Sequence, residues 1–172
     1  MQPSVYPILF EGRGRLWIMP RPKAEWLAEE IAAYRLIGMR KIISLLPVDE
    51  AEDLGLSEEA AFCALQGIAF VNYPIPDRCV AQDARSFRAL AGEVLCDLMA
   101  GVGVGIHCRA GIGRSGMLAC SVLGLHGMTP DHAIAHVCHA REMPVPDNDA
   151  QAAFIHHIIG AEDRPPNEQT LS

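Results

Sequence analysis

One loop of the sequence has the residue types and spacing for chemistry on an anion: residues 107–116 read HCRAGIGRSG. Its glycines allow the backbone to curl so that successive N–H groups point inward, and the helix expected after it adds partial positive charge. Arg114 can hold two oxygens of a phosphate group at once. The same field favours the thiolate form of Cys108. A thiolate beneath a bound phosphate is a nucleophile that can accept the phosphoryl group.

Other interpretations of this loop compete with that chemistry. Residues 111–116 also fit G-x-G-x-x-G, and Asp131 lies 20 residues beyond Gly111, as in a dinucleotide-binding fingerprint. That fingerprint needs a strand ending at the acidic residue, whereas Asp131 follows Thr-Pro and begins a helix. A purely structural cysteine is a second alternative. A loop that binds phosphate without turning it over is a third.

Short strands alternate with helices along the rest of the chain. Apolar and β-branched runs predict strands over residues 5–10, 15–19, 41–46, 70–76 and 102–107. Helical periodicity predicts helices over residues 23–37, 84–100, 115–126, 131–141 and 149–159. The acidic stretch 49–66 is also expected to be helical, with Ser57 as an N-cap. This alternation predicts an α/β fold with helices on both faces of the sheet, and the reactive loop follows the last strand.

Composition limits the partners and the compartment. The chain has 172 residues, which we interpret as one domain over residues 1–160 and a flexible polar tail over 161–172. The net charge of −7 argues against nucleic acid or an anionic membrane as the main partner. No apolar run approaches the about 20 residues of a membrane span, and the N-terminus lacks the pattern of a signal peptide. The six cysteines occur without a C-x-x-C pair, so a cytoplasmic protein is expected.

The loop matches the H-C-x5-R-[ST] signature and therefore resembles the cysteine-dependent protein tyrosine phosphatase superfamily. Within it, the chain resembles the compact dual-specificity branch, including bacterial relatives of the cyclin-dependent-kinase-associated phosphatase. The upstream features of this resemblance are MPRP, IISLL, LGLSEEA and GIAFVNYPIPD. The resemblance spans roughly residues 8–160 and implies a central, mostly parallel sheet of four or five strands. It also implies hydrolysis of phosphate monoesters through a phosphocysteine intermediate, without a metal or another cofactor.

The resemblance also assigns roles within the loop. Cys108 would be the nucleophile, and Arg114 would bind the phosphate and the transition state. His107 would orient the loop, and Ser115 would hydrogen-bond the Cys108 sulfur and help it leave. The remaining phosphate-binding positions would come from the backbone of the loop, namely Arg109, Ala110, Gly111, Ile112 and Gly113.

An acid must protonate the leaving oxygen, and a base must then activate water. Asp77 matches the acid position of the family, although the proline that often follows the acid is missing from Arg78-Cys79-Val80-Ala81. Asp83 is the rival acid, but its position favours an N-cap of helix 84–100. Gln151 is our candidate for positioning the water, the alternative being an ordinary residue of the first helical turn.

We therefore expect a phosphatase of phosphotyrosine, and also of phosphoserine or phosphothreonine, acting on proteins or peptides as a monomer with a shallow pocket. The alternatives are a phosphatase of a phosphoinositide or an RNA 5′ phosphate, or a phosphate-binding module without turnover. His132, His136 and His139 share a helix face, but no carboxylate or cysteine cluster completes a metal site. Spacing leaves open whether Cys79 or Cys120 can trap an oxidised Cys108.

Overall fold

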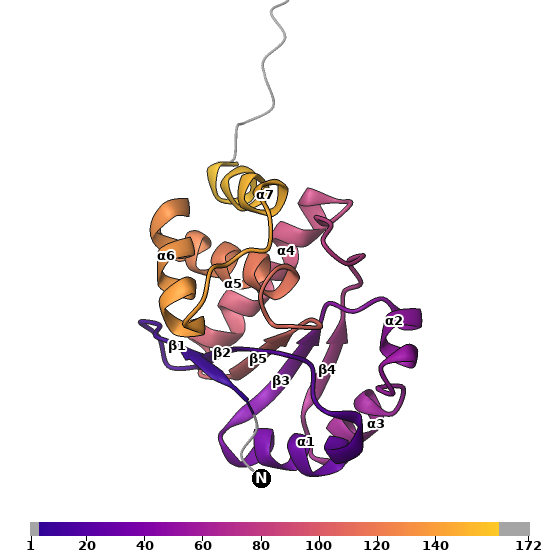
Figure 1. Cartoon of the computed structure of the whole chain (residues 1–172). Coiled ribbons are helices and arrows are strands. Elements are labelled where there is room, and N and C mark those ends of the chain that lie inside the picture. The colour runs from indigo at the N-terminus through magenta and orange to yellow at the C-terminus, as the bar shows by residue number, and fades with distance from the viewer. Residues whose placement is uncertain (1–3, 162–172) are drawn as a thin grey trace, which may run out of the picture.

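The computed structural model describes residues 4–161 and contains a five-stranded sheet in the order β1-β2-β5-β3-β4 (Figure 1). The strands are β1 (Tyr6–Ile8), β2 (Arg15–Met19), β3 (Met39–Ser44), β4 (Ala69–Asn72) and β5 (Gly103–His107). β1 pairs with β2 in the antiparallel sense, and the other three pairings are parallel. The expected α/β fold with a mostly parallel sheet is therefore confirmed.

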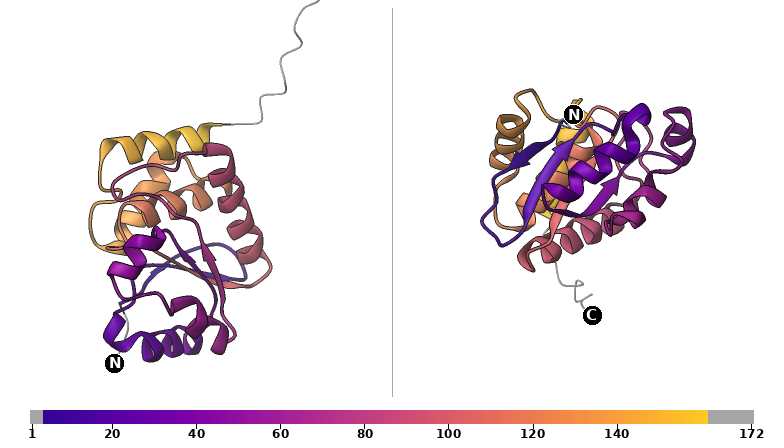
Figure 2. Two further views of the ribbon diagram at one scale, coloured as in Figure 1. Left: turned by 90° about the vertical axis from the view of Figure 1, so that its right-hand side faces the viewer. Right: turned by 90° about the horizontal axis from the view of Figure 1, so that it is seen from below.

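Helices cover both faces of this sheet, as Figures 1 and 2 show. The short η1 (Ala24–Trp26), α1 (Leu27–Leu36) and α3 (Glu59–Leu65) lie on one face, with α2 (Val48–Asp53) beside them. The opposite face carries α4 (Ala84–Met99), α5 (Arg114–Leu125), α6 (Pro130–Arg141) and α7 (Asp149–Gly160). Each face has its own buried apolar cluster, and the larger one lies beneath α4 to α7.

β5 lies at the centre of the sheet, and its position decides where the reactive loop emerges. All five of its residues are buried, because β2 and β3 flank it and helices cover both faces. His107 is in register with Met19 of β2 and Ser44 of β3. The loop therefore leaves the sheet where three parallel strands end together, and open α/β sheets bind ligands at such an edge.

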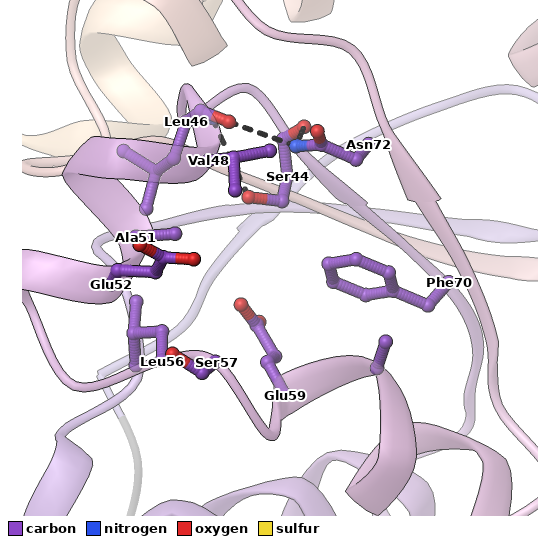
Figure 3. A pocket seen from close by; sticks show the side chains of 11 residues that line it. Ser44, Leu46, Val48, Ala51, Glu52, Leu56, Ser57, Glu59, Phe70 and Asn72 are labelled. Atoms are coloured by element: carbon purple, nitrogen blue, oxygen red, sulfur yellow. Dashed lines mark hydrogen bonds between the residues drawn. The ribbon is translucent and has the colours of Figure 1, made fainter.

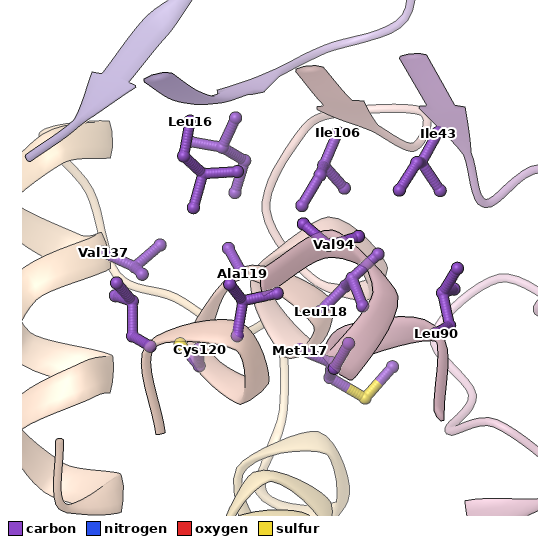
Figure 4. Close-up of a cluster of buried hydrophobic side chains, with 14 of the residues drawn as sticks. Leu16, Ile43, Leu90, Val94, Ile106, Met117, Leu118, Ala119, Cys120 and Val137 are labelled. Atoms are coloured by element: carbon purple, nitrogen blue, oxygen red, sulfur yellow. The ribbon is translucent and has the colours of Figure 1, made fainter. Parts of the chain in front are cut away.

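α5 lies in the middle of the larger apolar cluster. Its first ten residues, Arg114 to Leu123, are all buried, because the helix packs between the sheet and α4, α6 and α7. In Figure 4, Leu118 of α5 and Val94 of α4 lie beneath Ile106 of β5. The reactive loop is thus fixed between a central strand and a central helix.

The structure corrects three local predictions. The acidic stretch 49–66 is not one helix but two, because Gly55 adopts a φ of +72° after α2. Ser57 as an N-cap is wrong, since α3 begins after Glu58 without a side-chain cap. The strand predicted over 70–76 ends at Asn72, since the prolines that follow cannot donate to a sheet. The expected tail from residue 162 onward lies outside the described residues. Among the helices within residues 4–161, none is long and apolar enough to cross a membrane.

Candidate active site

The reactive loop after β5 comprises residues 108–114 and is called the phosphate loop from here on. Several of its carbonyls point outward. The Arg21 N–H donates to the Arg109 carbonyl at 3.2 Å. Arg141 of α6 donates from Nε to the Gly111 carbonyl at 2.8 Å and from Nη2 to the Ala110 carbonyl at 3.0 Å. Because these three carbonyls are bonded outside the loop, the loop can direct its N–H groups inward, as an anion cradle requires.

One glycine of this loop is required by its backbone surroundings, and a second lies close to two side chains. Gly111 has a φ of +69°, and a Cβ there would collide with the backbone of Met19 at the end of β2. A Cβ at Gly113 would collide with the carboxylate of Asp147, which precedes α7. The loop is therefore pressed between the sheet edge and the segment that leads into α7.

Cys108 and Ser115 lie together, as the sequence predicts. Cys108 is only 3% exposed, and its Sγ lies 3.2 Å from Oγ of Ser115. Ser115 is the second residue of α5 and is completely buried. The arrangement gives Cys108 the surroundings of a nucleophile.

Arg114 is held in a fixed orientation by a carboxylate from α2. Its Nη1 and Nη2 donate to the two oxygens of Glu50 at 2.7 and 2.9 Å, and Nη1 also donates to the Ile75 carbonyl at 3.0 Å. Burial by itself lowers the pKa of Arg114, but the hydrogen bonds to Glu50 and the charges of Cys108, Glu50 and Asp77 outweigh it and raise this pKa. The buried guanidinium therefore remains charged.

Asp77 lies at the mouth of the same loop. Its Oδ1 is 3.1 Å from Nη2 of Arg114, and its side chain is 53% exposed. The same oxygen accepts a hydrogen bond from the N–H of Arg78, which has a positive φ of 60°. Asp83 instead accepts from the N–H groups of Arg85 and Ser86, so its predicted role as the N-cap of α4 is confirmed.

Solved structures with this fold provide an independent comparison. Kinase associated phosphatase (KAP), in a form whose catalytic-site cysteine is replaced by serine, gives a TM-score of 0.84 at 16% identity, covering 94% of this chain and 98% of that chain. Tk-PTP in its active form gives 0.72 at 21% identity, covering 94% of this chain and 100% of that chain. PTPMT1 gives 0.70 at 15% identity, covering 91% of this chain and 94% of that chain. No family model and no curated protein sequence matches the chain.

The chain has the fold of a compact cysteine-dependent phosphatase. The resemblance drawn from the loop signature is confirmed at this level. In this phosphatase fold, Cys108, Arg114, Ser115 and Asp77 come together from the loop after β5, the start of α5 and the segment after β4.

His107, the last residue of β5, is completely buried and contacts two groups. Its Nδ1 lies 3.3 Å from the Cys108 carbonyl oxygen. Its Nε2 lies 2.9 Å from Oε1 of Glu59 on α3, although the two groups are not aligned as in a hydrogen bond. Glu59 also lines a cavity of about 260 Å³ between α2, α3 and β4, which includes Ser44 and Phe70 but neither Cys108 nor Arg114 (Figure 3). The sequence does not single out Glu50 or Glu59, because both are hidden in an acidic stretch typical of a solvated surface.

Gln151 lies near the phosphate loop, but its side chain has backbone partners. It is fully buried; its Nε2 donates to the Cys79 carbonyl at 3.1 Å, and its Oε1 accepts from the N–H of Asp147 at 3.1 Å. Each end of the amide thus makes one hydrogen bond to the backbone, and one N–H and one lone pair remain for a further partner, so the water-positioning role of Gln151 stays a prediction.

The remaining candidates from the sequence lie away from this centre. Of the three histidines on α6, His136 has its Nε2 2.8 Å from the Leu9 carbonyl oxygen. Among residues 4–161, no group of three or more His, Cys, Asp or Glu side chains can hold a metal ion. All six cysteines are free thiols. Cys120 is buried in the core, where burial and the charge of Cys138 raise its pKa, so its thiol is poorly suited to attack an oxidised Cys108.

Proposed function

We propose that the protein is a cysteine-dependent phosphatase that removes phosphoryl groups from phosphotyrosine, and from phosphoserine and phosphothreonine, in proteins or peptides. One observation carries the proposal. The Cys108 thiol, 3.2 Å from the Ser115 hydroxyl, lies on a loop whose Arg114 guanidinium contacts the exposed carboxylate of Asp77. A nucleophile, an anion-binding cation and a proton donor are thus placed around one loop.

In the first step of the proposed reaction, Arg114 and the loop N–H groups hold the phosphoryl oxygens. The Cys108 thiolate attacks phosphorus, so that an S–P bond forms while the bond from phosphorus to the leaving oxygen breaks. Asp77 gives a proton to that oxygen. The negative charge that develops on the phosphoryl group is stabilised by donors already oriented toward it.

In the second step, water attacks the phosphocysteine, and Asp77 takes the proton of the water. The S–P bond breaks, and the Cys108 thiolate departs with the electron pair. The hydroxyl of Ser115, at 3.2 Å from the sulfur, stabilises the departing thiolate by a hydrogen bond. The enzyme returns to its starting protonation state, and inorganic phosphate is released.

The rim of the loop supports a protein or peptide substrate. Arg109 and Ala110 are exposed beside the buried Cys108, while Ile112 is half-buried. We expect a rim with these exposed residues to accept phosphorylated side chains of different lengths, both tyrosine and the shorter serine and threonine esters.

A phosphoinositide is the second candidate substrate. PTPMT1, whose fold is similar to that of this chain, has been crystallised in complex with PI(5)P. Arg109 provides one exposed cation on the rim of the loop, but Ile112 provides no second one. The net charge of −7 also disfavours approach to an anionic membrane, so we place this candidate second.

The decisive experiment compares initial rates on five substrates: a phosphotyrosine peptide, a phosphoserine or phosphothreonine peptide, a phosphoinositide, a 5′-phosphorylated RNA and an aryl phosphate. We expect the highest kcat/KM on the phosphotyrosine peptide and none of this activity in Cys108→Ser. A higher kcat/KM on the phosphoinositide selects the lipid candidate. Phosphate binding without turnover of even the aryl phosphate indicates a binding module and overturns the proposal.

A further inference from the structure

The acid loop, residues 73–82, carries Asp77 between β4 and α4 and is attached differently on its two sides. Before Asp77 in the chain, the N–H of Ile75 donates to the Leu45 carbonyl at 3.0 Å, and the Ile75 carbonyl accepts from Arg114. This side therefore follows the sheet edge and the phosphate loop. The position of Asp77 also depends on what holds the loop beyond it.

Beyond Asp77, the acid loop is bonded to two side-chain amides at the start of α7. Nδ2 of Asn148 donates to the Arg78 carbonyl at 3.0 Å, and Nε2 of Gln151 donates to the Cys79 carbonyl at 3.1 Å. Two successive peptide carbonyls are thus held by residues about 70 positions later in the chain. Because Arg78 has a positive φ of 60°, which non-glycine residues adopt rarely, its conformation needs such support from its surroundings.

The two amides are themselves rigidly placed. Oδ1 of Asn148 accepts from the N–H of Gln151 at 2.9 Å and so caps α7. Oε1 of Gln151 accepts from the N–H of Asp147 at 3.1 Å, and the Gln151 side chain is fully buried. Each amide therefore uses its oxygen to fix itself on α7 and its nitrogen to hold the acid loop.

The start of α7 also contacts the phosphate loop. A Cβ on Gly113 would collide with the Asp147 carboxylate and would approach Oε1 of Gln151 closely. The same short segment thus lies against the loop that carries the nucleophile and the loop that carries the acid. We infer that Asn148 and Gln151 are positioning residues that hold Asp77 in place above the phosphate loop.

This inference rests on the proposed phosphatase function and differs from a role for Gln151 in orienting water. A water-orienting amide acts in the second step, on hydrolysis of the phosphocysteine. An amide clamp on the acid loop acts through Asp77, and therefore on every proton transfer that Asp77 makes. The clamp matters most when the leaving group is poor, because only then does its departure need the proton.

The first test does not depend on activity. Asn148→Ser keeps a capping oxygen for α7 but removes the amide nitrogen that reaches Arg78. Gln151→Met keeps the volume of the buried side chain and removes the bond to Cys79. The Cys79 N–H donates to the Pro76 carbonyl at 3.1 Å within the acid loop. We expect faster hydrogen exchange of this N–H in both variants, with unchanged exchange in β5. Thr129→Ala, which removes the cap of α6, is the matched control and leaves the acid loop unchanged.

The second test is kinetic. We expect each variant to lower kcat/KM on a phosphotyrosine peptide by about tenfold, a part of the about 10²–10⁴-fold that general acid catalysis supplies. On an aryl phosphate with a good leaving group, kcat/KM should stay within about twofold, because departure of that group needs no proton. In an Asp77→Asn background, neither substitution should lower the rate on the phosphotyrosine peptide further.

Two results would overturn the inference. One is unchanged exchange at Cys79 in the variants, and the other is a loss of rate that persists in the Asp77→Asn background. If Gln151→Met does not fold, both tests are made on Asn148→Ser alone, because Asn148 is only half-buried. If the wild-type protein turns over no phosphate ester, the proposed function fails, whereas the exchange experiment still decides whether the clamp exists.

Discussion

Glu50 accepts one hydrogen bond at each of its carboxylate oxygens from the two terminal nitrogens of Arg114, at 2.7 and 2.9 Å. Arg114 is only 2% exposed, and among the described residues Glu50 is the one partner that bonds both of its terminal nitrogens. A neutral amide at position 50 can accept at only one of its two ends. We expect Glu50→Gln to lower kcat/KM on the phosphotyrosine peptide by about tenfold to 10²-fold, because small misplacements of a binding group have effects of that size.

Steady-state kinetics on the purified variant checks this effect. Glu52→Gln is the matched control, because Glu52 lies on the same helix and lines the cavity without contacting Arg114. Equal losses in both variants would mean that the acidic helix acts through its overall charge rather than through the two hydrogen bonds.

Cys108→Ser should abolish turnover while phosphate or an analogue still binds. The serine hydroxyl keeps the shape of the phosphate loop, but it stays protonated at neutral pH and is a poor nucleophile. Isothermal titration with vanadate or tungstate measures the binding, and the aryl phosphate measures the turnover. Residual hydrolysis within about tenfold of wild type would exclude a phosphocysteine intermediate.

Asp77→Asn should reduce kcat steeply on substrates with poor leaving groups, by about 10²–10⁴-fold, and much less on an activated aryl ester. The reason is that an amide cannot donate the proton that a poor leaving group needs. The basic limb of the pH profile of kcat/KM should also flatten, since that limb reports loss of the acidic proton. Rates across a series of aryl and alkyl phosphates give the measurement.

Two other carboxylates serve as controls for the acid. Asp83→Ala removes the cap of α4 and should cost about 1 kcal/mol of stability with little effect on chemistry. Asp147→Asn alters the carboxylate that lies against Gly113. If either variant shows the dependence on the leaving group and Asp77→Asn does not, the acid is assigned to the wrong residue.

The free energy of unfolding should fall in alkaline solution. Burial, with a further contribution from the charge of Glu59, raises the pKa of Cys63 from 9.0 to about 12. Between these two pH values the unfolded chain has lost the Cys63 proton and the folded chain retains it, so stability decreases as pH rises. The slope from this one thiol is at most about 1.4 kcal/mol per pH unit.

Urea unfolding at a series of alkaline pH values measures that slope. Cys63→Ala removes the titrating group and should give a shallower decline, whatever it costs in absolute stability. An unchanged slope in Cys63→Ala would mean that Cys63 does not retain its proton in the folded protein.

The sequence predicts the phosphate loop well because its parts are contiguous. Cys108, Arg114 and Ser115 lie within eight positions, so a turn between a strand and a helix is enough to bring them together. The order of strands and helices also follows from local patterns, since the uncharged, apolar run 102–106 before His107 favours a central place in the sheet. Asp77 is expected from the resemblance to the phosphatase superfamily, since it matches the acid position of that family.

The supports of the loop could not be predicted in the same way. Glu50, Glu59 and Arg141 reach the phosphate loop or its histidine from segments 30 to 64 residues away, and only the packing of the helices brings them there. Charge patterns cannot separate these side chains from neighbours that face water. Gln151 is found by its place in the first turn of the last helix, but its bonds to Cys79 and Asp147 depend on the path of the acid loop.

The bonds from Arg21 and Arg141 to the loop carbonyls have a thermodynamic consequence. Arg141 is anchored a second time, since its guanidinium lies 4.0 Å from the centre of the Tyr6 ring. The conformational entropy of the phosphate loop is therefore lost when the chain folds, and little is left to lose when an anion enters. The interaction energy between the loop and a phosphoryl group is then available to stabilise the transition state instead of ordering the backbone.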